Sequence, residues 1–154
     1  MKTEGYSFLE TKNKIEHYCA YQERCHQEVV SKLYDLGADS EDRERLIGHL
    51  ISYNFLNEER FAEAYATGKF RMKKWGINKI KMHLKQKGVS DYSIKKGIKE
   101  IDQDDYLNVL EALAAKKHTE STGNQWEKLA KTKRFLYNKG YESDLIFEVL
   151  KKYS

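Results

Sequence analysis

The stretch LKQKG at residues 84–88 has two counterparts in this chain of 154 residues, LYDLG at 33–37 and LYNKG at 136–140. The three stretches begin 51 and 52 residues apart, at positions 33, 84 and 136, and each ends in Gly. Gly just past the end of a helix readily adopts the left-handed conformation that closes it. The pattern therefore predicts a helix, a tight turn and a second helix, repeated three times.

The residues after each Gly support this prediction. A polar residue that can begin a helix follows within three positions: Asp39 or Ser40, Ser90, and Glu142 or Ser143. Apolar residues then recur at helical spacing, which places each set on one helix face. These sets are Leu46, Ile47, Leu50 and Ile51; Ile94, Ile98 and Ile101; and Leu145, Ile146, Val149 and Leu150.

Each of the three predicted helix pairs has room for another helix before it, over residues 11–21, 58–74 and 104–117. The predicted fold is therefore all-α, with three tandem three-helix repeats. The expected boundaries are an N-terminal tail at 1–11 and repeats at 12–54, 55–102 and 103–154. Because a unit of about 50 residues buries little apolar surface alone, the repeats should stack into an elongated, curved array.

The middle repeat has the clearest helix signals. Asn57 can cap the helix at 58–74, and Leu56 and Phe61 are spaced for a hydrophobic staple across its start. Trp75 and Gly76 should end this helix, and the segment TESTGN at 119–124 predicts a turn-rich break in the third repeat. The residues of the helix expected to face inward are Phe61, Ala64, Tyr65, Gly68 and Met72.

Composition narrows the class of protein. The chain has no Pro, 34% charged residues and a mean hydropathy of −0.83, which together indicate a soluble and mainly helical protein. No apolar run approaches the roughly 18 residues of a membrane span, and the N-terminus lacks the apolar stretch of a signal peptide. We therefore expect a cytoplasmic protein without membrane contact.

The net charge of +4 hides an uneven distribution. Residues 1–68 carry 8 basic and 13 acidic side chains, residues 69–100 carry 11 and 2, and residues 101–154 carry 9 and 9. Rows of cations four apart repel one another, and an acidic or polyanionic partner would relieve that repulsion. The candidate partner- or nucleic-acid-binding residues are Lys69, Arg71, Lys73, Lys74, Lys79, Lys81, Lys85, Lys95 and Lys99.

The sequence shows no catalytic constellation. It contains no nucleotide-binding glycine motif, zinc-protease motif or serine-hydrolase motif, and its five His residues are scattered. Cys19 and Cys25 are six residues apart, about 9 Å along a helix, which is too far for a disulfide. Their spacing does not suit zinc either. We expect buried thiols, no metal, no cofactor and no enzymatic activity.

A longer match lies in the middle of the chain: FLNEERFAEAY at 55–65, Lys69, WG at 75–76 and INKIKMHLKQKGVS at 77–90. It resembles the central signature of the RecX regulatory family, and a weaker resemblance extends over residues 12–153. The signature residues are expected mainly to serve the fold. They are Phe55, Leu56, Asn57, Arg60, Phe61, Ala62, Gly76, Leu84 and Gly88.

The resemblance implies a monomeric, cytosolic modulator of the RecA recombinase that lies in the groove of the RecA filament on DNA. Such a protein would most often inhibit the ATPase and strand exchange of RecA. The resemblance leaves open direct contact with single- or double-stranded DNA. One alternative is a DNA-binding protein that acts independently of RecA through helix-turn-helix units. Another is an interaction scaffold unrelated to recombination, which would not bind RecA filaments.

Overall fold

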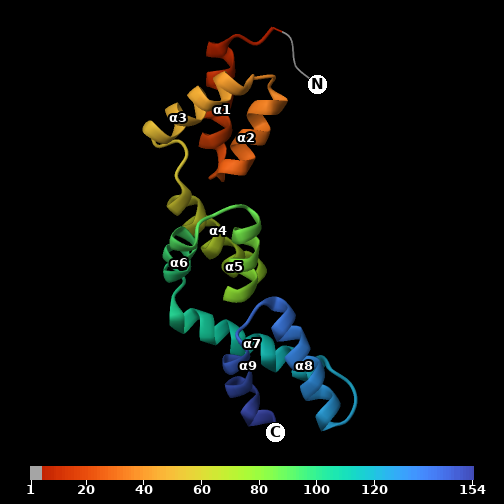
Figure 1. Cartoon of the computed structure of the whole chain (residues 1–154). Coiled ribbons are helices and arrows are strands. Elements are labelled where there is room, and N and C mark those ends of the chain that lie inside the picture. Colours follow the sequence, from red (N-terminus) through yellow and green to blue (C-terminus); the bar gives the residue numbers. More distant parts are fainter. Residues whose placement is uncertain (1–4) are drawn as a thin grey trace.

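The computed structural model describes residues 5–154 as an elongated array of helices without a strand (Figure 1). No helix in this range is both long and apolar enough to cross a membrane. The helices are α1 (Phe8–Tyr21), α2 (His26–Asp35), α3 (Ser40–Ser52), α4 (Glu58–Lys73), α5 (Ile77–Gln86), α6 (Asp91–Lys99), α7 (Gln103–Glu120), α8 (Gln125–Lys139), α9 (Ser143–Leu150) and a final 3-10 turn (Lys151–Tyr153).

The helices form three successive units, α1–α3, α4–α6 and α7–α9, which confirms the predicted all-α repeat fold. The three turn glycines have the positive backbone angle that their positions require. The φ angle is 84° at Gly37, 80° at Gly88 and 102° at Gly140. A residue with a side chain is strained at positive φ, whereas Gly is not. Each Gly can therefore end one helix and turn the chain so that the next helix packs against it.

Side-chain caps fix most helix starts. Asp39, Asn57 and Ser90 each accept a hydrogen bond from the backbone N–H three residues ahead. A further cap corrects the predicted tail at 1–11, because α1 already begins at Phe8. Ser7 and Glu10 form a reciprocal capping box there.

The units do not all share one core. Ile15, Val29, Leu33, Leu46 and Leu50 form the centre of a first core made by α1–α3. A second, continuous core runs through α4–α9, and the sulfur-bearing side chain of Cys25 joins it from the loop before α2. The second and third repeats therefore stack as the sequence predicts, whereas the first repeat has its own core.

Two details predicted for α4 are wrong. Leu56 packs in the first core and Phe61 in the second, so they do not form a staple. The inward face predicted for α4 is only partly right: Phe61 is buried, but Ala64 is exposed and Met72 is 81% exposed.

Close packing of α4 with α6 explains the second error. The fully buried residues of α4 include Ala62 and Ala66, whose small side chains let α6 approach. At Gly97 of α6, an added Cβ would lie 2.7 Å from the carbonyl carbon of Ala62. The small-residue face of α4 therefore faces its partner helix. Phe61 remains buried, whereas Tyr65 is only partly buried and Met72 is exposed.

The second and third repeats meet through backbone. The N–H of Gly76 donates to the carbonyl of Lys139 at 2.7 Å, and the N–H of Asn78 donates to the carbonyl of Gly140 at 2.8 Å. An added Cβ at Gly76 would lie 2.3 Å from the carbonyl carbon of Gly140. Only Gly fits at this position, where two chain segments touch.

Two buried tyrosines support the same joint. The hydroxyl of Tyr141 donates to the carbonyl of Lys74 at 2.8 Å. The hydroxyl of Tyr106 accepts from the N–H of Ile77 at 2.9 Å and donates to the carboxylate of Glu142. Burial, together with the hydrogen bond to Glu142, raises the pKa of Tyr106 well above its ordinary value. Both hydroxyls therefore remain protonated donors.

We predict that Gly76→Ala lowers the free energy of unfolding by about 2 kcal/mol, because the added methyl group must push the two backbones apart. Gly48→Ala is the matched control. Gly48 lies within α3 with nothing within 4 Å of its added Cβ, so this change should stabilise the chain by about 0.5 to 1 kcal/mol. Urea denaturation followed by circular dichroism measures both, and equal midpoints for the two variants would contradict the close contact.

Candidate interaction surface

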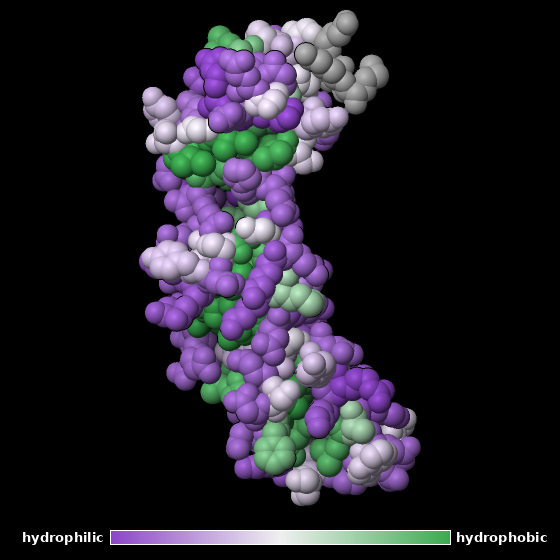
Figure 2. Space-filling model, viewed as in Figure 1, coloured by the Kyte–Doolittle hydropathy of each residue, from purple (hydrophilic) through white to green (hydrophobic). Residues whose placement is uncertain are grey.

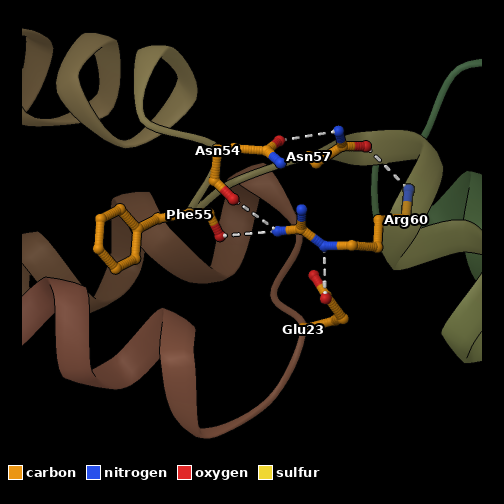
Figure 3. A network of polar contacts seen from close by, with 5 residues as sticks. All are labelled: Glu23, Asn54, Phe55, Asn57 and Arg60. Carbon is orange, nitrogen blue, oxygen red and sulfur yellow. Dashed lines mark hydrogen bonds and ion pairs between the residues drawn. The ribbon is translucent and has the colours of Figure 1, made fainter.

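Arg60 at the start of α4 connects the first repeat to the second (Figure 3). Its Nε donates to Glu23 Oε2 at 2.6 Å, in the loop between α1 and α2. Its Nη2 donates to the carbonyl oxygens of Asn54 at 2.9 Å and Phe55 at 3.3 Å, in the turn after α3. Both charged side chains are about one-third exposed, at 35% for Arg60 and 28% for Glu23. The guanidinium thus ties two segments of the first repeat to α4.

The other signature residues also have places in the fold. Leu56, Phe61, Ala62 and Leu84 are buried, and Phe55 packs partly buried against the first core. Asn57, Gly76 and Gly88 serve the cap, the backbone contact and the turn described above. Each of these residues therefore has a role in the fold that does not depend on a binding partner.

Two of the predicted basic residues lie against Trp75, which follows the end of α4. Lys79 Nζ lies 4.7 Å from the centre of the Trp75 ring, and Lys69 Nζ lies 5.2 Å from it. The ring of His83 lies on Trp75 as well, with 4.5 Å between centroids. Such contacts between cations and aromatic faces are favourable and hold the side chains in place.

Tyr65 extends this arrangement along α4. Lys69 Nζ lies 5.4 Å from the centre of its ring and Lys87 Nζ lies 5.6 Å from it. We call Tyr65, Lys69, Trp75, Lys79, His83 and Lys87 the Trp75 cluster. Its side chains come from α4, from the segment after α4, and from α5 and the turn that follows α5.

The electrostatic environment of the cluster is positive. Burial, followed by the nearby charges of Lys79, Lys69 and Lys87, lowers the pKa of His83 below its ordinary value. The imidazole is therefore neutral at pH 7 and can lie against Trp75 without adding a further charge.

The third repeat adds Lys139 to this surface. Its Nζ donates to the carbonyl of Lys73 at 3.0 Å. Burial and the charges of Lys79, Lys74 and Lys73 lower its pKa. The surface therefore crosses the joint between the second and third repeats.

The structure brings only part of the predicted basic set together. Lys69, Lys73, Lys74 and Lys79 contribute to the surface around Trp75 and Lys139. The ring contacts of the described residues do not extend to the rest of the set, whose members are exposed on α4, α5 and α6: Arg71, Lys81, Lys85, Lys95 and Lys99. Of these, Lys85 lies 3.5 Å from a carboxylate oxygen of Asp91.

Lys87 and Lys139 are functional candidates outside the predicted set. The repeat itself contains the signal that identifies them, because each directly precedes a turn glycine, at Lys87-Gly88 and Lys139-Gly140. The first repeat has Leu36 at this position.

A groove opens beside the Trp75 cluster. The five residues of α4 that were expected to face inward line it: Phe61, Ala64, Tyr65, Gly68 and Met72. Lys69, Lys73 and Lys87 line it as well, together with Glu23 and Glu28 of the first repeat. Figure 2 shows the same mixture on a larger scale, with hydrophobic patches along the array bordered by hydrophilic side chains.

The helix-turn-helix alternative finds little support in the second helix after each turn glycine. The first turns of α3, α6 and α9 carry Glu41 and Asp42, Asp91, and Asp144. Carboxylates at these positions would repel DNA phosphates, where a reading helix needs groups that bind bases. At the start of α6, moreover, the N-cap Ser90 and Ser93 donate their hydroxyl protons to Glu58, at 2.6 and 2.7 Å.

Comparison with known proteins agrees with this architecture. The family model of the second three-helix domain of RecX matches residues 57–98, and that of the third matches residues 104–150. The chain is 36% identical to the regulatory protein RecX of Clostridium tetani over 82% of its length, and spans 59% of that protein. It is 30% identical to the Clostridium perfringens protein of the same name, with 94% of this chain and 69% of that protein covered. The crystal structure of RecX from Lactobacillus salivarius superposes with a TM-score of 0.84 at 24% identity, over 95% of this chain and 96% of the other.

The fold thus defines a tandem three-helix repeat protein with a basic, aromatic surface at the junction of two repeats. The two matching domain models and the sequence identity to the Clostridium proteins show to which protein family this fold belongs here. The chain belongs to the RecX family of regulatory proteins.

We predict that Arg60→Ala lowers the free energy of unfolding by about 1 to 3 kcal/mol, because it leaves Glu23 and two carbonyl oxygens without their donor. Arg60→Lys should recover only part of the loss, since an ammonium group cannot reproduce the planar donor geometry. Arg71→Ala, an exposed arginine on the same helix, is the control and should change stability by less than about 0.5 kcal/mol. Urea denaturation tests all three; an Arg60→Ala variant as stable as the parent would show that Arg60 does not serve the fold.

Proposed function

We propose that this chain binds the RecA recombinase filament on DNA and inhibits its ATPase and strand exchange. It acts by binding and has no catalytic activity of its own. The observation that carries the proposal is the Trp75 cluster, in which Lys69, Lys79 and Lys87 lie against aromatic rings. It is found in a member of a family of regulatory proteins. A cytoplasmic monomer fits this role.

The physical case begins with the cost of holding these cations together. The lowered pKa values of His83 and Lys139 reflect burial and neighbouring lysines that disfavour further positive charge. An acidic protein surface or a row of phosphates would relieve this repulsion on binding. The cluster is thus prepared for a negatively charged partner.

The array also suits an extended partner. Its repeats are arranged in a row (Figure 1), so different units can contact successive subunits of a filament. Each contact raises the effective concentration of the next, which strengthens binding without a large single interface. The groove beside the cluster is lined by apolar residues of α4 and by Lys69, Lys73 and Lys87, so an acidic segment with an apolar side chain can dock there.

The test compares two triple variants that change net charge equally. One variant, Lys69→Glu with Lys79→Glu and Lys87→Glu, reverses the charge of the Trp75 cluster. The control, Lys81→Glu with Lys95→Glu and Lys99→Glu, reverses three exposed lysines that make no contact with the rings of the cluster. The readout is the ATPase of RecA on single-stranded DNA, titrated with each protein.

We expect the parent chain to lower the ATPase, and the cluster variant to need at least about tenfold more protein for half-inhibition because like charges now face each other. The control should stay within about threefold of the parent. An equal loss of inhibition in both variants would show that the overall charge of the chain, and not the Trp75 cluster, causes the inhibition. No change in ATPase over the full titration of the parent chain would reject the proposed function.

A further inference from the structure

The first repeat has an aromatic and basic pocket of its own, which no residue of the Trp75 cluster lines. It lies along one face of α1, the loop that follows it, and α2. We call it the Tyr21 pocket; its principal lining residues are Tyr6, Lys14, Tyr18, Tyr21, Arg24 and Lys32.

Arg24 is fixed within this pocket. Its Nε donates to the carbonyl oxygen of Tyr18 at 2.9 Å. Its guanidinium carbon lies 3.7 Å from the centre of the Tyr18 ring and 5.9 Å from that of Tyr21. Because the hydrogen bond and the stacking orient the side chain in advance, a ligand pays little entropy to use its remaining donors.

The aromatic and basic groups alternate. Lys32 Nζ lies 5.4 Å from the Tyr18 ring on α1, and Lys14 Nζ lies 4.7 Å from the ring of Tyr6. Tyr21 at the end of α1 is 83% exposed, so most of its ring surface is available to a ligand. The pocket therefore combines fixed cations with an open aromatic face.

The pocket is positively charged, although the segment that contains it, residues 1–68, has a net negative charge. Residues 1–68 have more acidic than basic side chains, yet no carboxylate lines the pocket in the described part of the chain. Among the ion pairs of residues 5–154, none involves Lys14, Arg24 or Lys32. The positive charge is thus concentrated where the exposed tyrosine lies.

We propose that the Tyr21 pocket binds single-stranded nucleic acid, with a base stacked on Tyr21 and the flanking phosphates on Arg24 and Lys32. Aromatic platforms beside cations bind single strands with little sequence preference, since every base has a flat face. A duplex keeps its bases stacked inside and cannot use Tyr21 in this way. An acidic peptide would use the cations, but its binding would not depend on a base.

The test needs only the chain and a fluorescein-labelled oligothymidylate of about 15 nucleotides, with binding followed by fluorescence anisotropy. A second oligonucleotide of equal length, with abasic sites in place of the bases, keeps the phosphates and removes the stacking. The variant is Tyr21→Ala, and the control is Tyr137→Ala, a 62% exposed tyrosine on α8 in the third repeat. Circular dichroism verifies that both variants fold.

We expect Tyr21→Ala to weaken binding of oligothymidylate about tenfold and to leave binding of the abasic oligonucleotide unchanged. Tyr137→Ala should bind both oligonucleotides like the parent. Lys32→Gln should reduce the slope of log K against log salt by about 0.7, the value for one phosphate contact on a single strand.

Two results would overturn the proposal. One is a Tyr21→Ala variant that binds oligothymidylate like the parent. The other is a parent chain that binds the abasic oligonucleotide as tightly as oligothymidylate, which would leave the pocket as a charge-only site of the kind an acidic peptide would occupy. Because RecA is absent from this experiment, its outcome is independent of the proposed function.

Discussion

The backbones of Gly76 and Gly140 touch, and the joint between the second and third repeats depends on this contact. A unit of three short helices buries little apolar surface by itself, and the second and third units share theirs in one core. The paired backbone hydrogen bonds at the two glycines bring the units close enough for α4–α9 to form one core. The buried hydroxyls of Tyr106 and Tyr141 satisfy polar groups that this approach would otherwise leave without partners.

The same joint builds the charged surface. Lys139 directly precedes Gly140, so the close approach that the glycines permit also carries its side chain to the end of α4. Trp75 occupies the corresponding place before Gly76 and supplies the ring against which Lys69 and Lys79 lie. The turn residues Gly76 and Gly140 thus determine where the basic side chains of the two repeats come together.

Much of this fold could be predicted from the sequence because its signals are local. Gly37, Gly88 and Gly140 require a particular backbone angle, and Asp39, Asn57 and Ser90 form caps within one helical turn. The buried face of α4 could not be predicted from periodicity. Periodicity groups Phe61 with Tyr65 and Met72, and of these Phe61 is buried. Contact with Gly97 of α6 buries Ala62 and Ala66 rather than the rest of that row. The candidate surface was likewise predictable only in part. The local excess of lysines identifies the basic repeat, whereas Lys139 joins the surface through a contact between segments that are distant in the sequence.

The separate cores also set the order in which the chain can fold during synthesis. The first core is complete once residue 56 has left the ribosome, because its buried members lie between Ile15 and Leu56. The second core stays unfinished until the last helix emerges, since Ile146 and Leu150 belong to it along with Phe61 and Ile80. Domains generally fold as units as they are made. The first repeat can therefore fold early. The apolar residues of α4 that belong to the second core, beginning with Phe61, stay open to solvent or to a chaperone until Leu150 is made, 89 residues later.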